Sequence, residues 1–370
     1  MAAAITTSPA LDALIDRVRA ARADKTPLNI TGGNTKAFYG EAPVGAPLDI
    51  RPLAGISSYE PTELVVTVRG GTPLAELEAA LAEQGQCLPF EPPRFAPGGT
   101  VGGMVSAGLA GPPRAAVGGV RDYVLGATLL NGRAEVLSFG GQVMKNVAGY
   151  DVSRVLAGAM GVLGVVCEVS LKVLPVPVAT ATLRFDRDEA TALKQLNTWG
   201  GQPLPINASA WWSGTLVLRL SGAAAAVQAA IARLGGEQVD PAMAAGFWAG
   251  MRDHRDEFFT AAHTAVAGGA TLWRLSVAQT APPLALPGEH LVEWGGGQRW
   301  VVTTAPAATL REAAVRAGGH ATAFRSSPAG GAGSPVFAPL SAPLARIHRE
   351  MKTAFDPDRI FNPGRLVPGL

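Results

Sequence analysis

Charged residues are scarce in this 370-residue sequence, at 16% of the chain against roughly 25% in an average soluble domain. The 31 basic and 29 acidic residues leave a formal charge of only +2, so there is no basic field of the kind that binds nucleic acid. Hydrophobic residues make up 48% of the chain, which excludes a mainly disordered protein. The length indicates about two domains.

Cysteine is nearly absent. Two residues, Cys87 and Cys167, cannot form a disulfide framework or hold a four-cysteine metal or iron–sulfur site. Their apolar neighbours predict ordinary buried thiols. The five histidines never occur in the H-x-H or H-E-x-x-H spacing, so we expect no metal site.

Long apolar runs and targeting signals are also missing. The most apolar run, Val155 to Cys167, is too short to cross a bilayer. Residues 1–10 have no basic flank before their short apolar stretch, which makes them a poor secretory signal. We therefore expect a soluble protein in a reducing compartment, the cytoplasm.

Several common catalytic motifs do not occur. The sequence has no Walker phosphate loop, no G-x-G-x-x-G and no G-x-S-x-G, which argues against a P-loop, a Rossmann dinucleotide site and a hydrolase nucleophile elbow. No titratable pair stands out as a general acid and base. The catalytic residues are therefore unknown from the sequence.

Glycine, in contrast, is abundant, with 45 residues, and three clusters fall within about 140 positions. The first, at 31–35, follows a strand pattern, the second runs from Pro97 to Gly108, and the third, Gly158 to Gly164, enters another strand pattern. Because glycine has no Cβ, consecutive backbone N–H groups can converge on an anion without a cationic side chain. Two such loops could hold a pyrophosphate, whereas one alone would more often be a set of turns.

Periodicity in the first half predicts an α+β arrangement. Asn131-Gly132 predicts a hairpin, and Thr72 is the expected N-cap of the second helix. The stretch from Pro97 to Gly119 shows little regular pattern. The predicted helices are 10–22 and 73–84, and the extended segments are 27–31, 63–68, 124–130, 134–139 and 162–174.

Pro175-Val-Pro177 is a predicted domain boundary, and the pattern of predicted strands and helices changes after it. The mixed charges from Arg252 to Glu257 indicate a solvated helix face. Strands alternating with helices suggest a compact α+β domain. Its predicted strands are 216–220, 272–277, 290–294 and 300–303, with a helix at 223–234.

A longer set of motifs carries a family resemblance. The run from Gly141 to Asp151, GQVMKNVAGYD, precedes the third glycine cluster, and the chain ends with Phe361-Asn-Pro-Gly364. With the second cluster, PGGTVGG, these motifs resemble the FAD-binding subunits of glycolate oxidases. The stretch from Asn29 to Pro175 is similar to the FAD-binding domain of the vanillyl-alcohol oxidase / p-cresol methylhydroxylase (PCMH) superfamily.

The resemblance implies an α+β fold in which two subdomains cradle FAD, a separate α+β cap follows, and a C-terminal segment returns to the flavin site. The implied domains are residues 1–176, 177–340 and 341–370. The implied cofactor-binding residues are Gly32, Gly33, Asn34, Thr35, Pro97, Gly98, Gly99, Thr100, Gly102, Gly103, Ser106, Gly108, Gly161, Val162, Gly164, Val166 and Asn362.

Three residues of the most distinctive motif have competing interpretations. Lys145 near a flavin ring could stabilise negative charge on the reduced flavin, and Tyr150 could be a hydrogen-bond donor. For Asp151, capping of the following helix is at least as good an explanation.

Two departures from the superfamily qualify the resemblance. Covalent members attach the flavin through a histidine or cysteine near these loops, but here the first loop continues as Lys36-Ala-Phe-Tyr-Gly40 and no cysteine lies between 88 and 166. We therefore expect non-covalent FAD. The superfamily's 2-hydroxy-acid dehydrogenases carry clustered histidines and an acid that bind a metal, and this sequence has no such cluster.

The implied function is that of an FAD-binding subunit in a glycolate oxidase (glycolate dehydrogenase) complex. A homologous catalytic flavoprotein subunit would oxidise glycolate to glyoxylate, and an iron–sulfur subunit would carry electrons to the membrane quinone pool. The complex would place this chain in the cytoplasm or peripherally at the inner membrane. Two alternatives stay open: a self-sufficient FAD-dependent oxidase or dehydrogenase of another 2-hydroxy acid or alcohol, and a non-catalytic assembly subunit with structural FAD.

Overall fold

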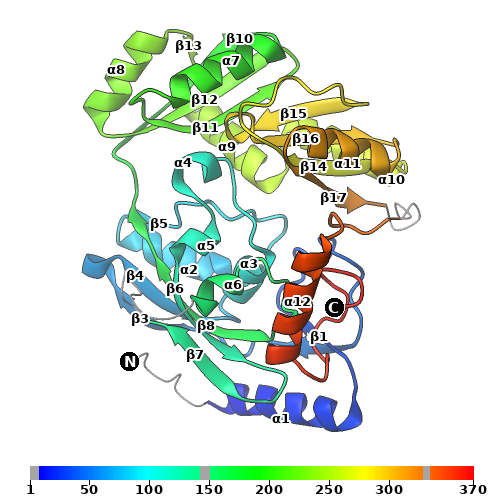
Figure 1. The fold of residues 1–370 in the computed structure, drawn as a ribbon. Helices are drawn as coiled ribbons and strands as arrows, with labels where there is room; N and C mark the ends of the chain where they lie inside the picture. Colours follow the sequence, from blue (N-terminus) through cyan, green and yellow to red (C-terminus); the bar gives the residue numbers. More distant parts are fainter. Residues whose placement is uncertain (1–7, 142–150, 328–333) are drawn as a thin grey trace. The chain divides into compact units, whose positions relative to one another are not determined.

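The computed structural model describes residues 8–141, 151–327 and 334–370. Contacts divide the chain into two units (Figure 1). The first comprises Met1–Leu109, Gly119–Pro175 and Pro339–Leu370, and the second comprises Ala110–Gly118 and Val176–Ala338. The short segment Ala110–Gly118 thus belongs to the second unit although its neighbours on both sides belong to the first.

The first unit contains a five-stranded antiparallel sheet in the order β3-β4-β8-β6-β7. Strand β6 is buried along its whole length because β8 and β7 flank it. The predicted hairpin at Asn131-Gly132 is confirmed, since it joins β6 to β7. The strands are β3 (Ile56–Glu60), β4 (Val65–Arg69), β6 (Val124–Leu130), β7 (Val136–Gly140) and β8 (Val165–Lys172).

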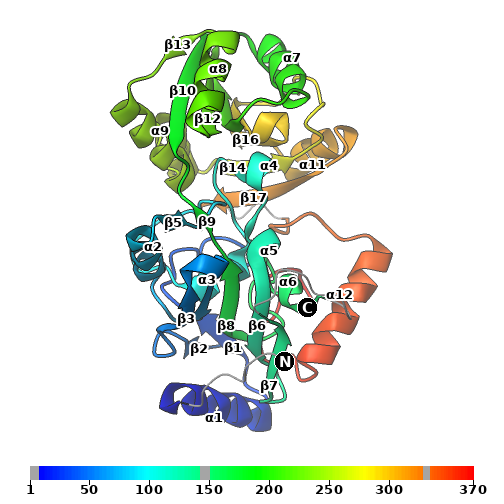
Figure 2. The ribbon, with the colours of Figure 1, turned by 90° about the vertical axis from the view of Figure 1, so that its left-hand side faces the viewer.

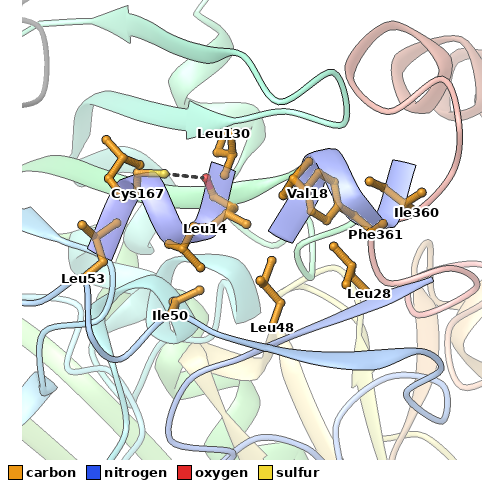
Figure 3. Close-up of a cluster of buried hydrophobic side chains, with 13 residues drawn as sticks. Leu14, Val18, Leu28, Leu48, Ile50, Leu53, Leu130, Cys167, Ile360 and Phe361 are labelled. Atoms are coloured by element: carbon orange, nitrogen blue, oxygen red, sulfur yellow. Dashed lines mark hydrogen bonds between the residues drawn. The ribbon is translucent and has the colours of Figure 1, made fainter. Parts of the chain in front are cut away.

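A smaller layer of the same unit pairs β1 (Leu28–Thr31) with β2 (Ala46–Asp49) in parallel. Helix α1 (Pro9–Asp24) covers this layer, with Leu14 and Val18 in its buried stripe (Figure 3). The C-terminal segment joins the layer through a parallel bridge between Leu28 and Phe361. Its predicted return to the first unit is therefore confirmed.

The helices of the first unit correct two predictions. Thr72 does not cap the second helix; Pro73 occupies that position, and the Thr72 hydroxyl instead bonds backbone groups of Gly55 and Arg69. A helix also forms where little regular structure was expected, because Thr100 accepts from the Gly103 N–H at its start. The helices are α2 (Leu74–Glu83), α3 (Val101–Ala107), α5 (Val120–Tyr123), α6 (Val152–Val155) and α12 (Ala342–Phe355), and β5 (Gln86–Cys87) pairs with β9 (Leu174–Pro175).

The second unit is built on an eight-stranded antiparallel sheet in the order β13-β10-β12-β11-β15-β16-β14-β17. Its strands are β10 (Ala179–Asp186), β11 (Ile206–Trp212), β12 (Thr215–Gly222), β13 (Glu237–Gln238), β14 (Thr271–Ser276), β15 (Glu289–Glu293), β16 (Gln298–Thr303) and β17 (His320–Ser326). Its helices are α4 (Arg114–Val117), α7 (Glu189–Gly200), α8 (Ala224–Leu234), α9 (Pro241–Asp253), α10 (Glu257–Ala267) and α11 (Ala307–Arg316).

The charge run in this unit is not a solvated helix face, which corrects that prediction. Helix α9 ends at Asp253, and His254 follows in the left-handed region with φ of 55°. Both side chains are buried. Arg252 and Arg255 contact the Asp253 carboxylate at 2.8 and 2.7 Å, so the run is a helix end closed by ion pairs.

The α+β class of the fold is confirmed in both units. In the described ranges, no helix combines the length and apolar character that crossing a bilayer requires.

Candidate functional site

The three glycine clusters meet in one cleft of the first unit. Twelve of the predicted cofactor residues line it, and they come from the first loop, α3 with its N-cap, the third loop with β8, and the C-terminal return. The twelve are Gly32, Gly33, Asn34, Thr35, Thr100, Gly102, Gly103, Ser106, Gly161, Gly164, Val166 and Asn362. Pro97, Gly98, Gly99, Gly108 and Val162 are not part of the lining that the structure describes.

The first loop presents backbone donors to the cleft. Asn34 has a φ of 53°, in the left-handed region. Within the described part of the chain, no hydrogen bond occupies the backbone N–H of Gly33, Asn34 or Thr35. Successive N–H groups around a left-handed residue form a concave nest that binds anions. The local geometry therefore fits a phosphate group.

The first and second loops touch each other directly. A Cβ on Gly33 would lie 1.6 Å from the carbonyl oxygen of Gly98, so only glycine fits at position 33. The sequence had suggested that glycine lets the backbone approach a cofactor; at Gly33 it lets one loop approach the other. The Gly99 carbonyl in turn accepts from the Leu74 N–H at 2.8 Å. Gly98 and Gly99 thus support the cleft from behind.

Asn362 ties the third loop to β1. Its Nδ2 donates to the Met160 carbonyl, and its Oδ1 accepts from the Ile30 N–H, both at 2.7 Å. Gly161 has a φ of 72°, and a Cβ there would lie 2.6 Å from the Asn362 Nδ2. Asn362 therefore lines the cleft while it fixes two of the segments that form it.

A buried lysine holds the C-terminal return against the third loop. Lys352 Nζ donates to the carbonyls of Val162 and Phe361 and to Asp356 Oδ2, each at 2.7 Å. The Asp356 carboxylate also accepts from the N–H groups of Ile360 and Phe361. Burial lowers the pKa of Lys352, and the Asp356 carboxylate opposes that shift. This network anchors the main chain on both sides of Phe361.

Arg365 is a cleft residue that the sequence interpretation missed. It lines the cleft, and its guanidinium donates to the carbonyls of Ala37, Tyr39 and Glu41. It thereby fixes the chain that follows the first loop. The available signal was a cation three residues after Asn362. Other lining residues outside the prediction are Asn29, Ile30, Lys36, Ala37, Pro43, Ile50, Ala107 and Met160.

The cleft suits the diphosphate part of a dinucleotide. Its volume is about 130 Å³, below the roughly 300–1,000 Å³ of pockets that enclose a whole ligand. Backbone donors line it together with two cationic side chains, Lys36 and Arg365.

The remaining site predictions have different outcomes. Asp151 caps α6, since its carboxylate accepts from the Arg154 N–H. Lys145 and Tyr150 lie outside the described residues. The described residues also contain no group of three or more His, Cys, Asp or Glu side chains that could hold a metal ion.

Comparisons with known proteins agree with this geometry. The family model of an FAD binding domain matches residues 3–140, which include the first two glycine clusters. The chain is 47% identical to glycolate oxidase subunit GlcE of Escherichia coli (strain K12), with 97% of each chain covered. It is 29% identical to glycolate oxidase subunit GlcD of Bacillus subtilis (strain 168) over 43% of this chain and 34% of that subunit.

A solved structure shows the same fold at low sequence identity. An alkyldihydroxyacetonephosphate synthase aligns with a TM-score of 0.65 and 15% identity, covering 96% of this chain and 76% of that one. This likeness extends through both units. Because the match to the GlcE subunit covers nearly the whole of both chains, the protein belongs to the glycolate oxidase subunit GlcE family and carries an FAD-binding domain of the PCMH type.

Proposed function

We propose that the cleft holds the diphosphate of non-covalently bound FAD. The observation that carries the proposal is the convergence of three glycine loops around the N–H groups of Gly33, Asn34 and Thr35. Lys36 and Arg365 add positive charge beside them. No histidine or cysteine is among the cleft residues that the structure describes, which supports FAD that can dissociate. Four predicted residues outside the cleft contact the segments around it. Gly98 lies against Gly33 and Gly108 lies against Gly158, while the Gly99 carbonyl accepts from Leu74 and the Val162 carbonyl accepts from Lys352.

At the level of the whole protein, the chain is the FAD-binding subunit of a complex that oxidises glycolate to glyoxylate. Its full-length similarity to GlcE supports this, and its similarity to GlcD supports a homologous flavoprotein partner. With two cysteines in the sequence, the chain cannot supply a four-cysteine cluster. Electrons therefore pass to a separate iron–sulfur subunit, and the complex operates in the cytoplasm or peripherally at the inner membrane.

FAD, when bound, supplies the redox chemistry, while the protein supplies binding, orientation and electrostatics. The first loop holds the diphosphate through main-chain donors. Asn362 and Lys352 keep the third loop and the C-terminal return in register beside it. The cleft lining that is described offers amides and cations but no carboxylate or imidazole. Because the sequence lacks the clustered histidines and acid of the superfamily's 2-hydroxy-acid dehydrogenases, we expect the partner flavoprotein to take the proton from glycolate.

Replacement of Gly33 tests the cofactor site. In Gly33→Ala the new methyl group meets the Gly98 carbonyl, so the loops separate and FAD affinity falls at least about tenfold. Gly246→Ala in α9 is the matched control, because a Cβ at Gly246 has open space around it. Flavin fluorescence titration of the apoprotein gives both affinities. Equal affinities, or yellow colour that stays with the denatured polypeptide, contradict the proposal.

Anaerobic addition of glycolate tests the activity. The flavin absorbance of the purified chain alone is expected to stay unchanged, whereas the assembled complex is expected to lose its flavin absorbance. Bleaching of the isolated chain would instead make it a self-sufficient enzyme. An assembled complex that reacts equally well with a chain lacking FAD would make this flavin structural.

A further inference from the structure

The turn between β4 and α2, Gly70-Gly71-Thr72, is buried. The sequence interpretation expected Thr72 only as a helix cap and gave the two glycines no role. None of the three residues is part of the cleft lining that the structure describes. The turn nevertheless contacts three segments that carry cleft residues: the start of α3, the start of β8, and residues 50–53 after β2. It therefore connects the walls of the cleft from behind.

The first of these contacts holds the second glycine cluster. The Gly70 carbonyl accepts from the Gly102 N–H at 2.7 Å, and the Thr72 carbonyl accepts from the Val101 N–H at 2.9 Å. Gly102 lines the cleft. Helices α2 and α3 lie side by side on either side of these bonds (Figure 2). The turn thus determines where α3 begins and where its cleft residues lie.

The second contact holds the start of β8, which follows the third glycine cluster. The Gly70 N–H donates to the Cys167 carbonyl at 2.8 Å. A Cβ on Gly70 would collide with the carbonyl oxygen of Val166, so only glycine fits at position 70. Val166 lines the cleft. Gly70 therefore bonds the second cluster through its carbonyl and the strand after the third cluster through its N–H.

The third contact reaches the first glycine cluster. The Gly71 N–H donates to the Leu53 carbonyl at 2.8 Å, and a Cβ on Gly71 would collide with the carbonyl oxygen of Ile50. Ile50 lines the cleft, and its N–H donates to the Thr31 carbonyl at 2.9 Å. The position of Gly71 is thus passed through residues 50–53 to the strand that leads into the first loop.

The side chain of Thr72 fixes the conformation of this turn. Its hydroxyl accepts from the Gly55 N–H at 2.9 Å and donates to the Arg69 carbonyl at 2.7 Å. Two consecutive glycines leave a backbone with many accessible conformations, so the turn needs a restraint from a neighbouring side chain. A hydroxyl can donate and accept at once. Without it, the buried Gly55 N–H and Arg69 carbonyl lose a partner.

We propose that Thr72 is a positioning residue for the cofactor. Its hydroxyl holds the turn that sets the separation of the three cleft segments, and it acts through Gly70 and Gly71 without touching the cofactor. The inference rests on the proposed function, because it takes the cleft as the site of the FAD diphosphate. Backbone donors bind an anion well only when they converge on it, so a shift of one wall weakens binding.

Thr72→Val provides the main test, because valine has nearly the same shape as threonine and lacks the hydroxyl. Thr72→Ser keeps the hydroxyl and is the rescue variant. Thr67→Val in β4 is the matched control, since it removes a buried bond of 2.8 Å between the Thr67 and Ser170 hydroxyls, which joins two strands of the sheet. Flavin fluorescence titration gives the FAD affinity of each apoprotein, and inorganic pyrophosphate serves as the competitor.

The titrations are made where urea unfolding shows every variant to be folded, because affinity then does not depend on the margin of stability. Thr72→Val is expected to bind both FAD and pyrophosphate at least about tenfold more weakly. Thr72→Ser and Thr67→Val are expected to bind both like wild type, although Thr67→Val unfolds at lower urea. If Thr72→Val does not fold, Thr72→Ala takes its place, since it removes the hydroxyl and introduces no new contact.

Equal FAD affinity in Thr72→Val and wild type overturns the positioning role and leaves the proposed function intact. Equal weakening in Thr72→Ser or in Thr67→Val also overturns it, because the hydroxyl of Thr72 would then not be the cause. Weaker FAD binding with unchanged pyrophosphate binding overturns the link to the diphosphate. A wild-type chain that does not bind FAD overturns the proposed function and this inference together.

Discussion

The two units use buried polar side chains differently. Around the cleft of the first unit, Asn362, Lys352 and Arg365 donate mainly to main-chain carbonyls of loops. In the second unit, buried carboxylates take a larger part: Glu293 accepts from Trp300 at 2.6 Å and from Gln298 at 3.0 Å, and Glu189 pairs with Arg299 at 3.0 Å, although Arg299 also donates to two main-chain carbonyls. Loops need such side chains to fix their backbone, whereas the strands of a sheet already pair with each other. Changes in the first unit should therefore affect FAD binding, and changes in the second only stability.

The largest loss of FAD affinity and of unfolding free energy is expected from Lys352→Met. The substitution leaves the Asp356 carboxylate buried without its cation, and loss of one partner of a buried pair costs about 3–5 kcal/mol. The C-terminal return then loosens from the third loop, so FAD affinity should fall together with the free energy of unfolding. Urea unfolding and flavin titration measure the two effects.

The double variant Lys352→Met/Asp356→Asn serves as the control for this prediction. It removes the stranded charge and should recover part of the stability but not the FAD affinity, because the Val162 carbonyl still lacks its donor. Full recovery of both quantities would show that the lysine only neutralises Asp356 and does not position the loop.

The next largest effect is expected at Glu293 in the second unit, on the pH dependence of the free energy of unfolding. Burial raises its pKa from 4.5 to about 7. Because the folded state holds its proton more tightly than the unfolded state, this group lowers the free energy of unfolding as pH rises from 4.5 to 7, by up to about 3 kcal/mol. Glu293→Gln should remove that part of the pH dependence.

The measurement for Glu293 is urea unfolding of both proteins across this pH range, followed by flavin titration at pH 7. The difference in unfolding free energy between variant and wild type should grow with pH, and FAD affinity should not change. A loss of FAD affinity in Glu293→Gln would contradict the prediction that changes in the second unit affect only stability.

Sequence reasoning found the cleft better than it found the supports of the cleft. Glycine clusters are local signals, and they include Gly33 and Gly161, which the family resemblance then assigned to the cofactor. Arg365, in contrast, contacts Ala37, 328 residues away, and no local pattern encodes such a pair. The same holds for Lys352, which bonds the Val162 carbonyl 190 residues away. Contacts that only the fold creates are not visible in one sequence.

Local composition also gives the wrong exposure where charged residues are buried in ion pairs. The run at Arg252–Glu257 has the composition of a solvated face, yet Asp253 is buried because two arginines neutralise it. Ala110–Gly118 shows the same limit at the level of the units, since nothing in its composition separates it from the flanking first unit. Val162 matched a cofactor motif, yet it lines a separate cavity beside α12 and is not part of the cleft lining that the structure describes.

Asn362→Ala compares the units at the level of single hydrogen bonds. It removes the bonds to Met160 and Ile30, which should cost about 2 kcal/mol of stability and about tenfold in FAD affinity. Asn197→Ala is the matched control in the second unit, where Asn197 donates to the carbonyls of Leu193 and Gln279. It should lower stability by a similar amount and leave FAD affinity unchanged. Equal loss of FAD affinity in both variants would mean that stability alone controls cofactor binding.

The smallest effect, the extent of thiol labelling, is expected at Cys167. This labelling tests whether the hydrophobic core next to the cleft stays closed. Burial raises the pKa of its thiol to about 12, so at pH 8 only about one molecule in ten thousand carries the reactive thiolate. Iodoacetamide should therefore leave Cys167 unmodified in the folded protein, while the half-buried Cys87 reacts slowly. Mass spectrometry after a timed pulse measures both. Cys167 packs with Leu130 and Leu53 in the core that α1 covers. Labelling of Cys167 in the FAD-loaded protein would therefore show that this core opens. In that case the hydrogen bonds of Asn362, Lys352 and Arg365 would not be enough to hold the cleft loops in place.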